Sequence, residues 1–277
     1  MSARSELLKQ QCKWAEATGL LPDARGYVPN LKANLYRPLS LIAKQCFSNG
    51  SGNELEDMKS RPAKMRALHS SSALVVNVFD YWTACDTKPL MKALGLTDAR
   101  SRIRFEAQFP TNLEGMPPNL DLAIELISGM TVGVESKFCE WLTPKTMKKE
   151  CFKPKYFPRG KFIWKDQGLS GCQELALSIH KGVDKYRYLD AAQLLKHALG
   201  LATKCSNRFI LYYLYYDWPC PESEQHKKEI DRFANLVGEE LRLRILTYQE
   251  LFRRLSTSTV ALDSGYLKYL RTRYFSG

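Results

Sequence analysis

The sequence contains no hydrophobic run long enough to cross a membrane. A membrane-spanning helix requires about 18 or more consecutive, mostly apolar residues, and no such run occurs anywhere in the 277 residues. The mean hydropathy of −0.35 agrees with this absence. The N-terminal residues are polar and lack the apolar core of a secretory signal. We therefore expect a cytoplasmic protein with no membrane partner.

Cysteine and histidine are too scattered to form a zinc module. Such modules pair their ligands at spacings of roughly two to four residues, whereas the closest two of the eight cysteines, Cys139 and Cys151, lie 12 positions apart. The four histidines form no cluster either. We expect reduced, mostly structural cysteines. The phosphate-binding loop, the nucleophile elbow and the Rossmann glycine pattern are also missing, so these enzyme classes have no support.

Positive charge, by contrast, is abundant. The 41 Lys and Arg residues outnumber the 29 Asp and Glu residues, which gives a net charge of +12 and an isoelectric point near 9.3. Such an excess favours a polyanionic partner, most often nucleic acid. The length is sufficient for a sizeable core in one elaborated domain, or in one and a half.

Apolar patterns along the chain predict an α/β fold in which helices flank a central sheet. Residues 1–69 are expected to form a helical extension, because prolines interrupt short helical segments there. Residues 70–277 are expected to form the core and the C-terminal elements. In chain order the predicted core elements are a helix at 70–82, a shorter helix at 89–96, strands at 102–109, 120–127 and 131–138, helices within 171–202, a strand at 209–216, a helix at 223–238, a strand at 241–246 and two short helices. Helix, three strands, helix and strand is a layered α/β plan.

The third strand carries a carboxylate and an ammonium side by side. Alternation along this strand places Gly133, Glu135 and Lys137 on one face, opposite an apolar face. Whether Asp121 joins them depends on the hairpin that precedes the strand. A two-residue loop, Ser128-Gly129, would send Asp121 to the opposite face.

A three-residue loop, residues 128–130, would instead pair Ile127 with Thr131. Asp121 would then lie across from Lys137 and diagonal to Glu135, roughly 7–8 Å away between backbones. We predict this loop, with Gly129 or its neighbour in the left-handed conformation.

Two carboxylates that converge beside a lysine suit the hydrolysis of phosphodiesters. Mg²⁺ prefers oxygen ligands and is commonly held by one or two carboxylates, with water and phosphate oxygens completing the octahedron. Asp121 and Glu135 are the predicted metal ligands, and Lys137 is expected to orient the attacking water or to neutralise the developing charge. The alternative interpretation is an exposed cross-strand salt bridge, worth less than about 1 kcal/mol.

With these residues, the chain resembles the PD-(D/E)xK nuclease superfamily over about residues 70–255. The signature is Pro118-Asn-Leu-Asp121 together with Val134-Glu-Ser-Lys137, although Leu120 rather than proline precedes the aspartate. The resemblance implies a restriction-endonuclease-like core with the order αβββαβ and a mixed sheet. It also implies hydrolysis that depends on Mg²⁺, for which Mn²⁺ would substitute.

The resemblance suggests two further site residues. Members of the superfamily often supply another acid from the first helix or strand, and Glu106 is our candidate, with a solvated strand glutamate as the alternative. Gln193-Leu-Leu-Lys-His197 looks like the Gln-x-x-x-Tyr element of some branches, with histidine in place of tyrosine. Gln193 would then contact the metal shell or the phosphate, and a plain polar helix face is the alternative for both Gln193 and His197.

Residues 143–165 carry eight Lys and Arg residues but only one acidic residue. Basic groups neutralise phosphates, and the interleaved aromatic residues could stack on unpaired bases if they are exposed. The predicted nucleic-acid-binding residues are Lys145, Lys148, Lys149, Lys153, Lys155, Arg159 and Lys161, together with Lys196 on the following helix.

We therefore predict a metal-dependent nuclease, expected to be a DNA endonuclease of the restriction or defence type. Cutting both strands of a duplex needs two centres, so a two-fold homodimer is expected if the protein restricts DNA. Two alternatives stay open at this point. One is a nucleic-acid-binding module of the same fold that no longer cuts, and the other is an unrelated basic α/β protein that binds acidic protein or membrane surfaces.

Overall fold

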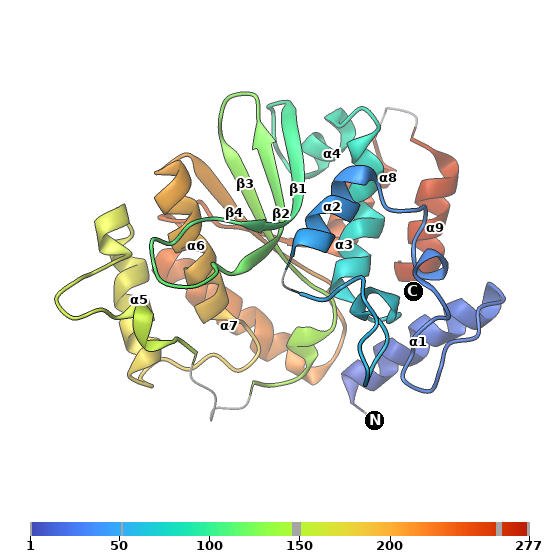
Figure 1. The fold of residues 1–277 in the computed structure, drawn as a ribbon, viewed down its shortest axis with the longest axis horizontal. Coiled ribbons are helices and arrows are strands. Elements are labelled where there is room, and N and C mark those ends of the chain that lie inside the picture. The colour runs from blue at the N-terminus through green and yellow to red at the C-terminus, as the bar shows by residue number, and fades with distance from the viewer. Residues whose placement is uncertain (1, 51, 146–150, 259–261, 276–277) are drawn as a thin grey trace.

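The computed structural model describes residues 2–50, 52–145, 151–258 and 262–275. A five-stranded mixed sheet in the order β1-β2-β3-β4-β5 forms the centre (Figure 1). Strands β1 (Arg100–Gln108), β2 (Asn119–Leu126) and β3 (Thr131–Lys137) are antiparallel. Strands β4 (Phe209–Tyr215) and β5 (Arg244–Thr247) continue the sheet parallel to β3.

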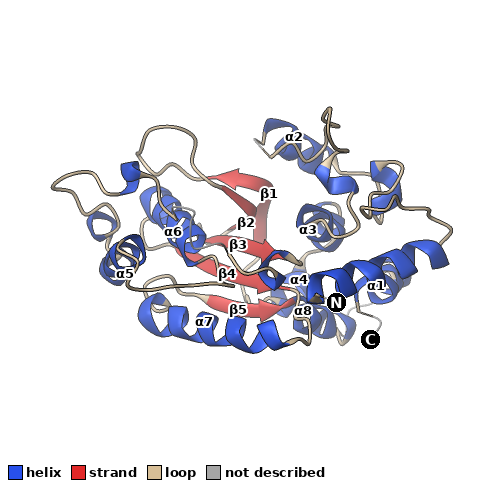
Figure 2. Ribbon diagram, turned by 90° about the horizontal axis from the view of Figure 1, so that it is seen from below, coloured by secondary structure: helices blue, strands red, loops and turns tan. Residues whose placement is uncertain are grey.

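Helices cover both faces of the sheet, as the edge-on view in Figure 2 shows. One face carries α6 (Ala191–Cys205) and α7 (Pro221–Val237), with α5 (Ser170–His180) packed against both. The other face carries α3 (Ser71–Phe79), α4 (Lys88–Ala93), α8 (Tyr248–Ser256) and α9 (Ser264–Tyr274). The extension supplies α1 (Ala3–Ala17) and α2 (Leu41–Asn49). No described helix is both long and apolar enough to cross a membrane.

The local sequence explains where the core helices begin. The Ser70 hydroxyl accepts a hydrogen bond from the Ala73 amide at 3.2 Å and starts α3, and the Asp190 carboxylate accepts one from the Gln193 amide at 3.0 Å and starts α6. Such caps satisfy amides that have no partner within the helix. The predicted order αβββαβ and the mixed sheet are confirmed. The last strand begins at Arg244 and not at residue 241, because the chain turns there with Arg242 in the left-handed region (φ 45°).

The N-terminal helices share their apolar core with the sheet. Leu7 of α1 and Phe47 of α2 are buried in the same continuous cluster as the strand residues. The side chain of Gln11 donates a hydrogen bond to the carbonyl of Arg273 in α9 at 3.0 Å, and the buried Arg273 guanidinium lies 4.4 Å from the ring centroid of Trp14. The N-terminal extension therefore packs against the sheet core and against the C-terminal helix α9.

The hairpin between β2 and β3 has a loop of the predicted length in a different position. The amide of Leu126 donates to the carbonyl of Met130 at 2.9 Å, so residues 127–129 form the loop, and Gly129 is left-handed with φ 80°. Glu125 consequently pairs with Thr131. The prediction that residues 128–130 form the loop is therefore wrong by one residue. The prediction that Asp121 lies across from Lys137 is wrong as well, because this register places Asp121 across from Glu135. Both registers keep Asp121 on the same face of the ladder because side chains alternate with a period of two.

Candidate active site

Three acidic residues occupy matching positions on three adjacent strands. Phe105 pairs with Leu122, and Leu122 pairs with Val134. Continued by one position, the same pairings place Glu106 of β1 opposite Asp121 of β2, and Asp121 opposite Glu135 of β3. The three acids therefore lie in one row across the sheet.

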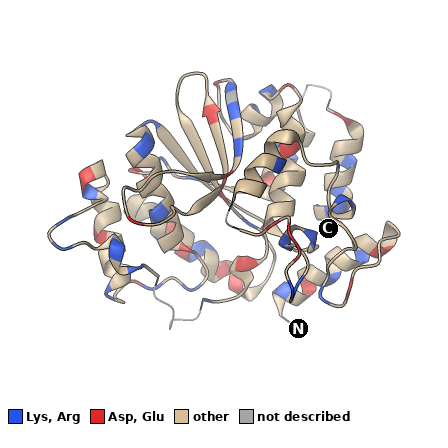
Figure 3. Cartoon of the chain, viewed as in Figure 1, with Lys and Arg blue, Asp and Glu red and all other residues tan. Residues whose placement is uncertain are grey.

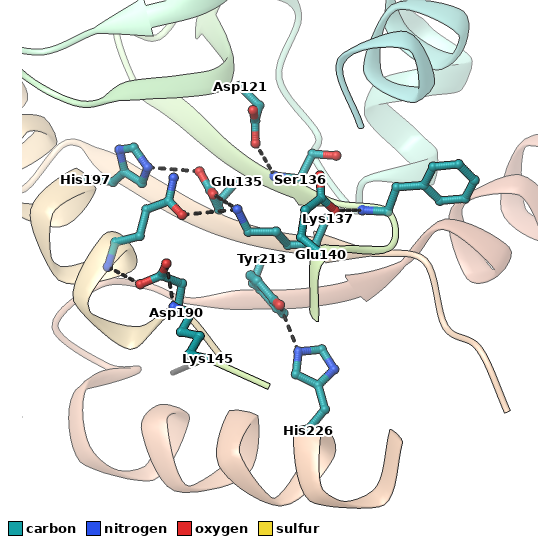
Figure 4. A network of polar contacts seen from close by, with 12 residues as sticks. Asp121, Glu135, Ser136, Lys137, Glu140, Lys145, Asp190, His197, Tyr213 and His226 are labelled. Carbon is teal, nitrogen blue, oxygen red and sulfur yellow. Dashed lines mark hydrogen bonds and ion pairs between the residues drawn. The ribbon is translucent and has the colours of Figure 1, made fainter. Parts of the chain in front are cut away.

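Asp121 leaves the regular ladder at this point and bonds to β3 through its side chain. Its carboxylate oxygen Oδ2 accepts a hydrogen bond from the backbone amide of Ser136 at 2.7 Å (Figure 4). Burial and then the neighbouring charge of Glu135 raise the pKa of Asp121 well above its usual value, although Lys137 acts in the opposite direction. Two carboxylates that disfavour each other's ionisation are stabilised by an added cation.

Glu106 has an unusual backbone for a strand residue. Its φ of 45° lies in the left-handed region, which costs a non-glycine residue about 1–3 kcal/mol and is typical of functional positions. The side chain accepts a hydrogen bond from Nδ2 of Asn119 at 2.6 Å. Burial raises the pKa of Glu106 to about 7, with smaller contributions from Glu54 and Glu135. The structure thus places the predicted additional acid in line with the other two.

Glu135 and Lys137 form a buried ion pair. Nζ of Lys137 lies 2.5 Å from Oε1 of Glu135, whose side chain is only 1% exposed. Burial raises the pKa of Glu135, but Lys137 and His197 outweigh this effect and hold the pKa below its usual value. Burial lowers the pKa of Lys137, yet Glu135 and Asp121 raise it well above its usual value. The neighbouring carboxylates therefore favour the charged form of Lys137, and the exposed salt bridge considered above is excluded by the burial of the pair.

Helix α6 brings two more polar side chains to the pair (Figure 4). The side-chain oxygen of Gln193 accepts a hydrogen bond from Nζ of Lys137 at 3.1 Å. One turn further along, Nε2 of the buried His197 lies 2.9 Å from Oε2 of Glu135. Both residues of the Gln-x-x-x-His element thus face β3. The four-residue spacing predicted that His197 lies on the same side of the helix as Gln193. The sequence pattern alone did not distinguish a site residue from an ordinary polar helix face.

The carboxylate oxygens of the site suit a hard divalent cation, but they are too few to complete its coordination. Oxygens from Asp121 and Glu135 are the ligands that Mg²⁺ prefers, and Oε2 of Glu135 is a buried oxygen that accepts no aligned hydrogen bond from the described residues. No group of three or more His, Cys, Asp or Glu side chains within the described ranges is gathered closely enough to hold an ion unaided. Mg²⁺ commonly uses only one or two protein carboxylates, so the residues fit a site completed by water and phosphate.

Two of the predicted phosphate-binding lysines are held by the protein itself. The ammonium of Lys145 pairs with the carboxylate of Asp190. Nζ of Lys196 donates a hydrogen bond to the carbonyl of Cys151 at 2.5 Å and lies 5.1 Å from the ring centroid of Phe152. Both ammonium groups thus have partners within the protein, and phosphate binding by Lys145 and Lys196 stays a prediction.

The remaining basic residues of this segment differ in exposure. Lys148 and Lys149 lie outside the described residues. The ammonium of Lys155 donates to the carbonyl of Glu114, which ties the segment to the loop between β1 and β2. The exposed members are Lys153, Arg159 and Lys161. They belong to the stretch before α5, at the left of Figure 3, and keep the predicted role.

The aromatic residues of the same segment mostly face inward. Phe152, Tyr156 and Trp164 are buried against one another and against α6, and Phe157 is half-buried. Only Phe162 among these rings is exposed, at 52%. The expectation of a stacking platform is therefore wrong for the buried rings, because they pack against one another and against α6 and do not face solvent.

Comparison with known families matches residues 22–275 to a family described as "Restriction Endonuclease associating with ARP". The match spans the sheet, both helical layers and most of the N-terminal extension. No curated protein and no solved structure matches the chain.

Proposed function

Because this chain belongs to the family of restriction endonucleases associating with ARP, we propose that it is a Mg²⁺-dependent endonuclease that hydrolyses the phosphodiester bonds of DNA. Membership of a restriction-endonuclease-like family supports nuclease function and nucleic-acid binding in general. The ion, the substrate and the roles of individual residues are the proposed part.

One observation carries the proposal. The register of β1, β2 and β3 aligns Glu106, Asp121 and Glu135 in one row, and the Lys137 ammonium lies 2.5 Å from the last of them. A structural salt bridge would not require a second and a third acid in that row. Glu135 contributes to the raised pKa values of Asp121 and Glu106, and acids with pKa values shifted by a neighbouring charge are typical of functional sites.

The residues have distinct proposed tasks. Asp121 and Glu135 would hold the ion, with Glu106 as an additional acid on the neighbouring strand. When bound, Mg²⁺ supplies a Lewis acid for the phosphate and lowers the pKa of a coordinated water. Glu135 and Asp121 raise the pKa of Lys137 and so favour its charged form; its proposed task is to orient the attacking water or to stabilise the negative charge that develops on the phosphate. Gln193 holds the ammonium of Lys137 in this direction.

Exposed cations of the segment before α5 would contact the nucleic-acid backbone. Lys153, Arg159 and Lys161 are proposed to do so, and the net charge of +12 would accelerate encounter with DNA. Cleavage of both strands would require two copies of the centre, so we also propose a two-fold homodimer on DNA.

A plasmid-nicking assay with added Mg²⁺ tests the proposal. The unaltered protein is expected to convert supercoiled plasmid to nicked or linear DNA, and Lys137→Ala and Asp121→Asn are expected to abolish this conversion. Glu125→Gln is the matched control, because Glu125 lies on the same strand but pairs with Arg104 at 3.1 Å, so its activity should be retained.

Two results would argue against the proposal in different ways. Equal nicking by the unaltered protein and Lys137→Ala would show that the activity comes from elsewhere. Tight DNA binding without any cleavage in Mg²⁺ or Mn²⁺ would instead favour the alternative of an inactive nucleic-acid-binding module. Calorimetry with Mn²⁺, repeated on Asp121→Asn, measures the ion independently of the reaction.

A further inference from the structure

The N-terminal extension reaches the row of acids through the chain that follows α2. Helix α2 ends at Asn49, and the next residue, Gly50, lies directly against Glu106. A Cβ atom at Gly50 would be 3.4 Å from the Cβ of Glu106. The backbone of the extension therefore borders the candidate active site, on the side of β1.

Lys64 lies at this border. Its ammonium donates a hydrogen bond to the carbonyl of Gly52, two residues beyond Gly50. It also lies 3.1 Å from Oε1 of Glu54. The Lys64 side chain is 45% exposed, whereas that of Glu54 is 11% exposed. The ammonium is thus held by the Gly52 carbonyl and the mostly buried Glu54, and the Lys64 side chain remains open to solvent in part.

The charges of this pair act on the site. Although burial is the largest influence on the pKa of Glu106, Glu54 raises it further and Lys64 lowers it. Glu54, Glu106, Asp121 and Glu135 would together repel a phosphate that approaches this end of the sheet. A cation on the β1 side would reduce that repulsion, as Lys137 does on the β3 side.

The backbone around Lys64 is fixed by hydrogen bonds. The amide of Met65 donates to the carbonyl of Glu54 at 3.0 Å. The side-chain amide of the buried Asn34 donates to the carbonyls of Met65 and Ala67 at 2.6 and 2.9 Å. The position of Lys64 is therefore set by the fold and not by a loose surface loop.

We propose that Lys64 binds a phosphate of the nucleic-acid strand at the candidate active site, so that the N-terminal extension supplies one wall of the substrate cleft. The inference rests on the proposed function, because it assumes that nucleic acid occupies this site. A lysine ammonium suits the role as a compact point charge that can contact phosphate oxygens from several directions.

Binding of a fluorescently labelled DNA duplex tests the role of Lys64. Anisotropy is measured in Ca²⁺ across a range of salt concentrations, for the unaltered protein and for Lys64→Gln, Lys64→Arg and Lys59→Gln. Loss of one phosphate contact should reduce the slope of log K against log salt by about 0.9 and weaken binding about eightfold at 0.1 M salt. Lys64→Arg, which keeps the charge, should bind nearly as well as the unaltered protein. Lys59→Gln removes one exposed charge from the same segment and should leave the slope unchanged.

A second measurement requires no substitution. Acetylation of lysines by an activated ester, followed by mass spectrometry, should modify Lys64 in the free protein and much less in the DNA complex, while Lys59 reacts equally in both. The proposal is overturned if Lys64→Gln and Lys59→Gln have the same salt slope, or if DNA leaves Lys64 fully reactive. Failure of the proposed function is a separate result, because it is measured as the absence of plasmid cleavage by the unaltered protein in Mg²⁺, whether or not the duplex is bound.

Discussion

Replacing Lys137 with methionine should destabilise the protein through the charge that it leaves behind. Methionine has a similar length but no charge. The substitution would remove the partner 2.5 Å from Oε1 of Glu135, whose side chain is 1% exposed, and leave His197 at 2.9 Å as the adjacent cation-forming group. Breaking a buried pair from one side typically costs about 3–5 kcal/mol, because the remaining charge is uncompensated. We expect a loss of that size in the free energy of unfolding at pH 7.

The loss should depend on pH in a defined direction. In the unaltered protein the pKa of Glu135 is held below its usual value, so the pair contributes stability above the unfolded pKa of about 4.5, and this stability disappears as the pH falls through the lower folded value. Without Lys137, burial would raise the pKa of Glu135 instead. Protonation of Glu135 on acidification would then relieve the unpaired charge, so the difference between the two proteins should shrink from pH 7 to pH 5.

Urea unfolding followed by tryptophan fluorescence at both pH values measures this effect. Glu135→Gln is the matched background, because it keeps the shape of the side chain and removes its charge. Adding Lys137→Met to Glu135→Gln should cost much less than adding it to the unaltered chain. A cost below about 0.5 kcal/mol at pH 7, or the same cost in both backgrounds, would refute the argument that the buried charge is responsible.

Three other predictions concern separate parts of the molecule. Burial lowers the pKa of His226 to about 3, so the free energy of unfolding should fall by about 1.6 kcal/mol from pH 6.5 to pH 5 as the unfolded chain takes up the proton. Urea unfolding of His226→Phe should lack this component, and identical pH profiles would contradict it. Gly133→Ala would place a Cβ 2.7 Å from Cδ2 of Leu120 and 2.9 Å from Cδ1 of Leu201. Overpacking of this kind should lower the free energy of unfolding by about 1–3 kcal/mol, and in a double-mutant cycle this loss should shrink when Leu201 is shortened to alanine. With the pKa of Glu106 at about 7, Mn²⁺ affinity measured by calorimetry should decrease as the pH falls below 7, because protons compete with the ion for the carboxylate. Glu106→Gln should flatten this pH dependence, and parallel curves for the two proteins would exclude Glu106 as a ligand.

Some features of the site could be predicted because they follow from local geometry. Alternation along β3 put Glu135 and Lys137 on one face, and any strand conformation at those residues would do the same. The helical spacing of Gln193 and His197 likewise put both on one side of α6. The element order followed from hydrophobic periodicity and from the residues that start helices and turns. The carboxylates, the lysine and the glutamine were therefore recognisable as candidates from residue type and spacing.

Charge and aromatic content were less informative about the basic segment. The sequence shows that Lys145 and Lys196 are positive, but it does not show that Asp190 and the carbonyl of Cys151 hold them. It likewise does not show that Trp164 is completely buried. Exposure depends on which surfaces meet, and residues 151–165 meet α6 through contacts with residues 30 or more positions away along the chain.

The sequence by itself determined the residue types of the site and the face that each presents within its own strand or helix, because backbone geometry repeats every 2 residues in a strand and every 3.6 in a helix. Tertiary structure alone decided the alignment of Glu106, Asp121 and Glu135, which depends on a hairpin loop at residues 127–129 and on the pairing of β1 with β2. It also decided that Gly50 of the N-terminal extension lies against Glu106, 56 positions later in the sequence. Strand register and helix docking are set by packing between distant segments, and no local periodicity encodes them.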